Sequence, residues 1–260
     1  MIKMQVLKEL FLYRELLKSN IKKEIRGKYK GSFLGILWSF VSPLLMVCVY
    51  AIVFPLILRV TQENYVIFLI VGILPWIFFT TVVNQGVTTV LNNAGIIKKV
   101  FFPREILPIS IATSGLINFL ISCIIIFIAL FISGIGLSKF IIFLPIIILI
   151  QYILCLSIIF ILSAINVYLR DIEYIINFLI MMLFYFTPVI YNLTLIPERF
   201  RPFFYLNPMV TIINSYRDIL YHQVMPNLKH IGLVGLASLI LLMLSYKIFK
   251  KLEKGFAEEV

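Results

Sequence analysis

The chain has 260 residues, of which 62% are hydrophobic and only 13% are charged, and its mean hydropathy is +1.05. This much apolar surface exceeds what a core of that length could bury, so the composition excludes an ordinary soluble globular protein. The net charge of +11 could indicate nucleic-acid binding. In a membrane chain, however, the preference of Lys and Arg for cytoplasmic loops is the nearer explanation, and we expect no nucleic-acid partner.

The first 30 residues are predicted to form an amphipathic helix on the cytoplasmic side. Apolar residues recur at steps of three or four from Val6 to Ile21, while Lys18, Lys22 and Arg26 fall on another side. Such a helix lies in the membrane interface, where it either anchors the chain to anionic lipid or takes part in gating or substrate uptake. The length and charge of this segment argue against a cleaved signal peptide.

Six membrane-spanning helices are predicted, because a span needs roughly 20 mainly apolar residues. Five long stretches carry no Lys, Arg, Asp or Glu, and a sixth ends at Lys247, which can reach the headgroups. The expected spans cover residues 34–58, 65–83, 106–132, 140–167, 174–191 and 231–248. The expected fold class is therefore an all-α polytopic membrane protein, with residues 1–260 forming a single transmembrane domain.

The charge distribution orients these spans. With both termini in the cytoplasm, the inner segments hold seventeen of the 23 Lys and Arg residues. The positive-inside rule therefore places both termini in the cytoplasm, including the tail at 249–260. We expect a multi-pass protein of a bacterial or archaeal inner membrane.

The outer segment between the fifth and sixth spans, residues 192–230, is rich in proline. Two stretches in it, Pro202–Tyr216 and Ile219–Leu228, are apolar but too short to cross a bilayer. Re-entrant or interfacial half-helices that line a cavity would suit them, and a simple external cap is the alternative.

Motifs for chemistry are mostly absent. The sequence contains no GxxxxGK[ST] phosphate loop, no GxGxxG after a strand and no HExxH, and the predicted spans contain no carboxylate pair. Cys48, Cys123 and Cys155 fall inside spans and suit packing, while His222 and His230 lack partners at metal-ligand spacing. We expect no catalytic residues, no metal site and no cofactor on this chain, and hence a transporter subunit that is powered by another protein.

Four short motifs follow one another along the chain: Arg26–Trp38 (RGKYKGSFLGILW), Ile97–Glu105 (IKKVFFPRE), Asn166–Asp171 (NVYLRD) and Phe249–Glu258 (FKKLEKGFAE). Their order resembles the membrane subunit of ATP-binding-cassette exporters for O-antigen, capsule and teichoic acid. The resemblance covers nearly the whole chain. It implies a homodimeric permease for a lipid-linked polysaccharide, which recruits two copies of a separate ATPase subunit that carries ATP and Mg.

The resemblance also assigns roles to the basic segments. Without it, the mixture of cations and aromatics after the second span suits either a helix docked on a partner protein or ordinary positive-inside charge. The residues implied to couple to the ATPase are Lys98, Lys99, Phe101, Phe102, Pro103, Arg104, Glu105, Arg170 and Asp171. Those implied to meet the lipid pyrophosphate, where the lipid-linked glycan enters, are Arg26, Lys28 and Lys30, because cations suit that anion.

Aromatic side chains in the spans are candidates for a channel wall, because a ring face can stack on a sugar ring. The candidates are Trp38, Tyr50, Phe54, Trp76, Phe79, Phe184, Tyr185 and Tyr191. For each of them, a lipid-facing or interfacial position is the alternative.

Two other functions compete with polysaccharide export. One is export of a small lipid or drug by the same architecture, which the cationic RGKYKGS motif disfavours. The other is a membrane enzyme that processes polyprenyl-phosphate lipids, which would need a cluster of acids or histidines at the membrane edge.

Overall fold

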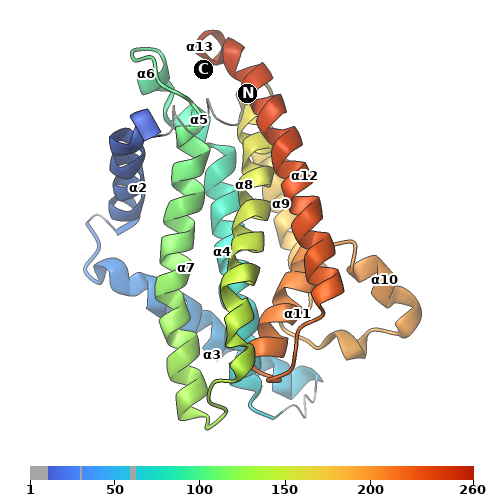
Figure 1. Ribbon diagram of the computed structural model, residues 1–260. Helices are drawn as coiled ribbons and strands as arrows, with labels where there is room; N and C mark the ends of the chain where they lie inside the picture. The colour runs from blue at the N-terminus through green and yellow to red at the C-terminus, as the bar shows by residue number, and fades with distance from the viewer. Residues whose placement is uncertain (1–10, 30, 59–62) are drawn as a thin grey trace.

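The computed structural model describes residues 11–29, 31–58 and 63–260, which are largely helical and contain no strand (Figure 1). The long helices are α2 (Arg14–Tyr29), α3 (Trp38–Leu58), α4 (Tyr65–Val87), α7 (Ile106–Ile132), α8 (Leu144–Tyr168), α9 (Ile172–Phe186), α11 (Pro208–Leu220) and α12 (Leu228–Leu252). The short helices are α5 (Thr89–Asn92), α6 (Ala94–Ile97), α10 (Arg201–Phe204) and α13 (Phe256–Glu259). The all-α polytopic fold class is confirmed.

Five helices of the described chain, α3, α4, α7, α8 and α12, are long and apolar enough to cross a membrane. Their positions match five of the six expected spans, and α7 has the predicted ends. At the place of the expected fifth span, the apolar helix α9 has only 15 residues. It stops at Phe186 because Pro188 cannot continue the helix, whereas the hydropathy pattern ran on to Tyr191.

Helix α4 is the centre of the bundle. It packs against α3, α7, α8, α9 and α11, and 78% of its apolar segment is buried, against 11% for α3. Small residues allow the close packing: a Cβ at Gly86 would lie 2.4 Å from Cγ2 of Ile159, and one at Gly115 of α7 would lie 2.3 Å from Cγ2 of Val82. Helix α3 therefore lies at the edge of a tightly packed core.

Buried polar side chains connect α4 to its neighbours. Gln151 of α8 donates to the carbonyl of Pro75 in α4 at 2.7 Å and accepts from the Tyr216 hydroxyl of α11 at 2.9 Å. Gln151 and Tyr216 are fully buried. Since an unpaired polar group in this environment costs several kcal/mol (roughly 2–7), this chain of hydrogen bonds fixes the three helices in one register.

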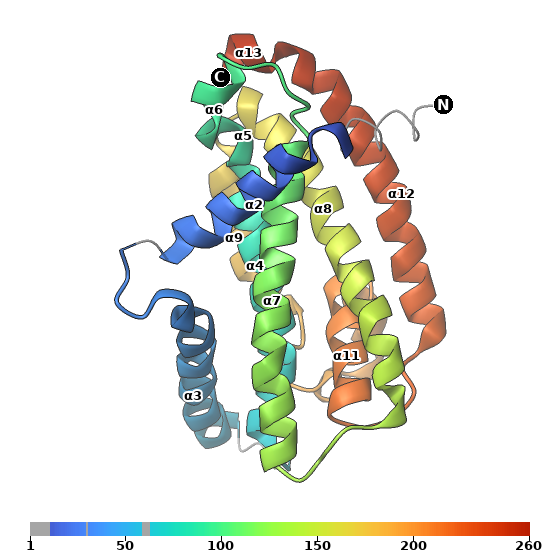
Figure 2. The ribbon, with the colours of Figure 1, turned by 60° about the vertical axis from the view of Figure 1, so that its left-hand side comes forward.

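The amphipathic helix α2 crosses the side of α7 near the end of the bundle that carries α5, α6 and α13 (Figure 2). We call this end the basic end, because it presents Lys98, Lys99, Lys251 and Lys254. A side chain of α2 also reaches the junction of α5 and α6, since Nζ of Lys23 donates to Oδ1 of Asn93 at 3.0 Å. Residues 1–10 of the predicted interfacial helix lie outside the described residues.

The predicted re-entrant region contains one substantial half-helix instead of two. Helix α11 is buried against α4 and α8, whereas α10 is a single turn at the surface. The expected second half-helix, Ile219–Leu228, does not form: the chain leaves α11 after Leu220 and turns through Gln223, which has a φ of 56°. Pro226 further disfavours helix there.

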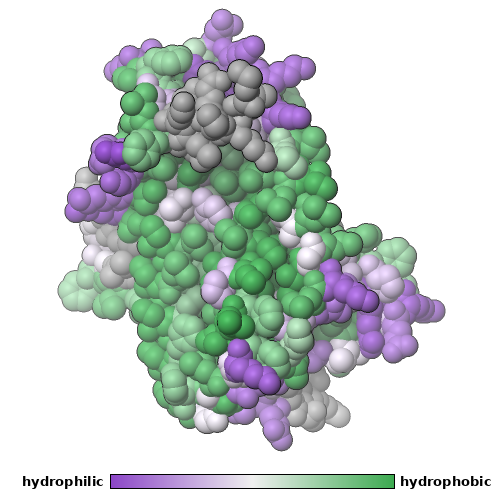
Figure 3. All heavy atoms as spheres, in the orientation of Figure 1, coloured by the Kyte–Doolittle hydropathy of each residue, from purple (hydrophilic) through white to green (hydrophobic). Residues whose placement is uncertain are grey.

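The surface supports membrane insertion. In Figure 3 apolar side chains cover the middle of the visible face, while hydrophilic side chains gather toward its two ends. This is the distribution that a bilayer requires of a spanning protein.

Candidate functional site

Three of the four motifs meet at the basic end, although they are far apart in sequence. Glu105 of the second motif is completely buried, and its carboxylate accepts from Nζ of Lys250 at 2.8 Å. Arg104 donates to the backbone carbonyl of Glu253. The Tyr168 hydroxyl of the third motif donates to the carbonyl of Leu252 at 2.8 Å. These contacts hold the C-terminal segment against the ends of α7 and α8, and we call them the C-terminal clasp.

A glycine and buried aromatic rings complete the clasp. Phe249 and Phe256 are fully buried, with ring centroids 5.5 Å apart. A Cβ at Gly255 would lie 2.5 Å from the hydroxyl of Tyr168, so only glycine permits this approach without a shift. The last motif, FKKLEKGFAE, thus contains both the ring packing and the close contact that the clasp needs.

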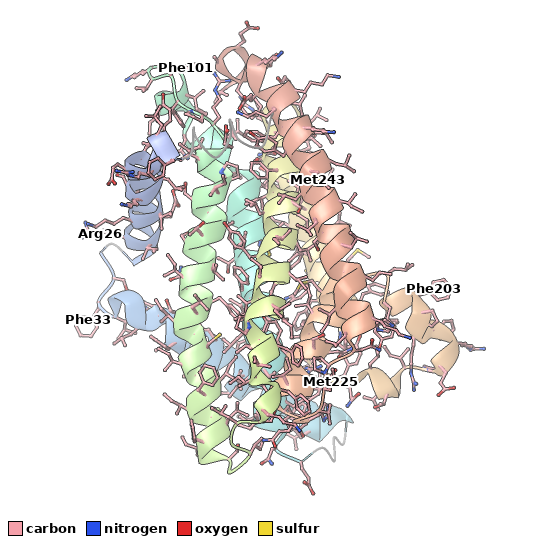
Figure 4. The ribbon with its side chains drawn as sticks, in the orientation of Figure 1. Arg26, Phe33, Phe101, Phe203, Met225 and Met243 are labelled. Carbon is pink, nitrogen blue, oxygen red and sulfur yellow. The ribbon has the colours of Figure 1, made fainter. Side chains whose placement is uncertain are left out.

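The clasp divides the residues that were expected to couple to an ATPase. Phe102 and Glu105 are buried inside the chain, at 5% and 0% exposed, and Arg104 is partly buried. Phe101, in contrast, is 91% exposed and projects at the tip of the basic end (Figure 4). The surface left for a partner comprises Ile96, Lys98, Lys99, Val100 and Phe101, together with the exposed Arg170 and Asp171.

Of the cations expected near a pyrophosphate, Arg26 is exposed on α2 and points away from the bundle (Figure 4). The side chain of Lys28 and the whole of Lys30 lie outside the described residues. Within the described chain, no three His, Cys, Asp or Glu side chains are placed to hold a metal ion.

Six of the eight predicted channel aromatics form one cluster across α3, α4 and α9. Phe184 is its centre: its ring centroid lies 6.0 Å from that of Tyr50 and 5.8 Å from that of Trp76. Such separations are typical of attractive ring pairs. The members of this aromatic patch are Tyr50, Phe54, Trp76, Phe79, Phe184 and Tyr185.

The patch has a buried base and an exposed edge. Trp76 and Phe79 are buried in α4, whereas Tyr185 of α9 is 66% exposed. Tyr191 reaches the edge by donating its hydroxyl to the carbonyl of Tyr185 at 2.7 Å. Trp38 lies apart and lines a separate cavity.

After α9, the chain runs without regular helix from Thr187 to Asn192 while still buried. Side chains satisfy its carbonyls: Tyr65 donates to the carbonyl of Ile190 at 2.7 Å, and Arg217 donates to those of Pro188 and Val189. Irregular backbone at membrane depth is tolerated only with such partners. We call this segment, 187–192, the carbonyl loop.

Arg217 is the main partner of the carbonyl loop. It is 2% exposed, and its guanidinium carbon lies 3.5 Å from the ring centroid of Phe68. A Cβ at Gly72 would lie 2.5 Å from Nη2 of Arg217, so the glycine makes room for the guanidinium. On sequence alone, Arg217 is one of the six Lys and Arg residues outside the expected cytoplasmic segments. The available signal was its place in a mainly apolar stretch, now α11, where Asp218 is the only other charged residue.

Comparison with known proteins gives a consistent result. Residues 15–221 match the family described as ABC-2 type transporter. An O-antigen export system permease protein RfbA from Myxococcus xanthus is 34% identical over 98% of this chain and 99% of its own length. A protein of the same name from Klebsiella pneumoniae is 35% identical over 91% of both chains.

The clasp predicts the effect of removing its cation. Lys250→Met would leave the buried Glu105 carboxylate without its cation, so we expect a loss of on the order of 3–5 kcal/mol in stability. The measurement is thermal unfolding of the purified protein in detergent, with Lys251→Met, at an exposed neighbouring position, as the control. If both variants unfold at the wild-type temperature, the Glu105–Lys250 pair does not hold the clasp.

The carbonyl loop predicts that Arg217→Met is strongly destabilising, because the variant keeps the apolar stem but leaves two buried carbonyls unpaired. At roughly 1–3 kcal/mol for each unsatisfied group, the melting temperature should fall by several degrees. Arg217→Lys should recover part of the loss. Arg199→Met, at an exposed arginine of the same outer region, should have no effect. Equal melting temperatures for Arg217→Met and Arg199→Met would contradict this role.

Proposed function

The chain belongs to the ABC-2 type transporter family, and we propose that it is the permease subunit of an ATP-driven exporter that moves a lipid-linked polysaccharide across the inner membrane. Full-length similarity carries this proposal: the Myxococcus xanthus relative, an O-antigen export permease, aligns over 99% of its length. A similarity of that extent includes both the apolar helices and the two basic end segments. The cargo that fits best is therefore a glycan of the O-antigen type.

The aromatic patch supports this cargo. Rings present apolar faces that stack on the C–H sides of a sugar ring, while the sugar hydroxyls keep their water. Tyr185 is exposed beside the apolar outer faces of α3 and α9. We propose that two copies of the chain meet through these faces, and that the glycan passes between them along the two patches. A homodimer would cover apolar surface that no other part of the described chain covers.

The basic end supports an ATPase partner. Phe101 and Val100 are exposed apolar side chains next to Lys98 and Lys99, a composition typical of a protein contact. A cavity of about 620 Å³ adjoins them, and Leu12, Phe101 and Lys254 are among its lining residues. We propose that the ATPase, which would carry ATP and Mg, binds at this surface with Phe101 as its anchor, and that Arg170 and Asp171 make a second contact.

The position of Arg26 supports a binding site for the pyrophosphate of the lipid carrier. It is exposed on α2, the helix that crosses α7 at the basic end. We propose that it meets the pyrophosphate of the lipid-linked glycan together with Lys28 and Lys30, since cations at the interface attract that anion.

The anchor role of Phe101 can be tested by co-purification. Phe101→Asp should reduce recovery of the ATPase at least tenfold, because a charge would replace the apolar contact. Phe203→Asp is the matched control, since Phe203 is also exposed but lies on α10 (Figure 4). Phe102→Asp should instead destabilise the chain itself, since Phe102 is buried. Full ATPase recovery with Phe101→Asp would refute the proposed contact.

The cargo surface can be tested by glycan export in cells. Tyr185→Ala should lower the amount of polysaccharide at the cell surface several-fold while membrane insertion and ATPase recovery stay normal. Phe131→Ala is the control, since Phe131 of α7 is equally exposed but outside the patch. Unchanged export with Tyr185→Ala and with Phe184→Ala would argue against the aromatic patch as the glycan surface.

A further inference from the structure

A half-open cavity lies between the start of α3 and the middle of α4 and α7. Its volume is about 480 Å³, within the range of small-molecule sites. Residues from Ser32 to Pro43 form one wall, Leu74 to Thr81 form the second, and Gly115 to Ser122 form the third. In Figure 2, α3 stands beside α7 and below α2.

Two of the three walls of the cavity lie near the middle of helices that are long enough to cross a membrane. Its α4 residues begin nine residues after Tyr65, and its α7 residues begin nine residues after Ile106. At 1.5 Å per residue, both sets lie about 14 to 24 Å from the ends of two helices that run in opposite directions. In a hydrocarbon core about 30 Å thick, that is the central region.

The lining combines apolar side chains with polar ones that are uncharged. Ser32, Ser42, Thr81, Asn118 and Ser122 contribute hydroxyl and amide groups, and none of the described lining residues is charged. Oδ1 of Asn118 is buried and accepts no hydrogen bond. The Ser122 hydroxyl donates to the backbone carbonyl of Asn118 at 2.9 Å and keeps its lone pairs as acceptors. Since an unpaired buried polar atom is costly, a ligand hydroxyl that donates to Oδ1 of Asn118 would stabilise it.

One aromatic wall is available beside these groups. Trp38 is 42% exposed, whereas Phe78 and Phe119 stack on each other with centroids 5.1 Å apart and are buried. The Trp38 indole can therefore stack on the apolar face of a bound ring, while polar groups at the edge of that ring form hydrogen bonds with the hydroxyl and amide side chains of the lining. This combination of a flat apolar wall and neutral polar groups suits a sugar ring.

We propose that this cavity binds one neutral sugar unit, with Asn118, Ser122 and Thr81 as hydrogen-bonding partners and Trp38 as the stacking partner. The identification of this unit with the exported glycan rests on the proposed function. A charged headgroup is disfavoured, because burial of its charge without a counter-ion would be costly. The site differs from the aromatic patch, since it lies within one chain and shares no residue with it.

The test uses Trp38 as its own reporter. In a Trp76→Phe background Trp38 is the only tryptophan, so its fluorescence can be followed in the full-length chain in phosphatidylcholine vesicles. The probe is hexyl β-D-glucopyranoside, which partitions into the bilayer, and hexanol is the control that lacks the sugar. We expect a saturable spectral shift with the glucoside and only a linear change with hexanol.

Variants of the lining residues test whether the fluorescence response comes from this cavity. Asn118→Leu should weaken binding of the glucoside about tenfold, because an amide that pairs with hydroxyls is lost. Ser110→Ala is the matched control, two turns away on α7, where its hydroxyl bonds to the carbonyl of Ile106. If Asn118→Leu does not insert, Ser42→Ala on the exposed helix α3 should weaken binding by a smaller factor.

Two results would overturn the proposal: a response shared by hexanol, or a sugar response that neither lining variant changes. The titration requires neither the ATPase nor export. No sugar response together with normal glycan export would therefore refute the cavity alone. A normal titration in a chain that exports no glycan would refute the proposed function and leave the sugar site standing.

Discussion

The buried hydrogen bonds made by Gln151 are the constraint on which the bundle depends. Gln151 joins the middle of α4 to α8 and α11, where water cannot replace a lost partner. Asn166 adds a second link by donating to the carbonyl of Val87 at 3.2 Å. Apolar packing alone would let these helices slide or rotate in lipid, because hydrocarbon tails are as apolar as the helices. The polar links give α4 one position, and the aromatic patch and the carbonyl loop are both positioned by side chains of α4.

The need of buried polar groups for partners also explains why motifs from distant parts of the sequence meet at the basic end. Each contributes a group that the others need: Glu105 needs a cation, the end of α12 needs donors for its carbonyls, and Tyr168 needs a neighbour without a Cβ. A motif that looks like a partner-binding segment can therefore be partly internal: Phe102 and Glu105 are buried, and the exposed residues from Lys98 to Phe101 are left for another protein.

Most of the fold could be predicted from the sequence, because a spanning helix is a local property of composition. Charge-free stretches located α3, α4, α7, α8 and α12 within a few residues. The outer region was harder, since Pro188 ended α9 where hydropathy continued, and one of two expected half-helices became a turn. The candidate site was predictable only in part. Phe101 and Phe102 have the same hydropathy, and only packing separates them; the partners of Arg217 lie at least 26 residues away in sequence.

The early end of α9 makes this part of the fold depend on irregular backbone. A helix of 15 residues is about 22 Å long, several ångströms less than the hydrocarbon thickness. The carbonyl loop continues the chain beyond that length, and its carbonyls accept hydrogen bonds from Tyr65 of α4 and Arg217 of α11. The apolar length that α9 lacks is therefore supplied by a loop that is stable only while α4 and α11 are in place.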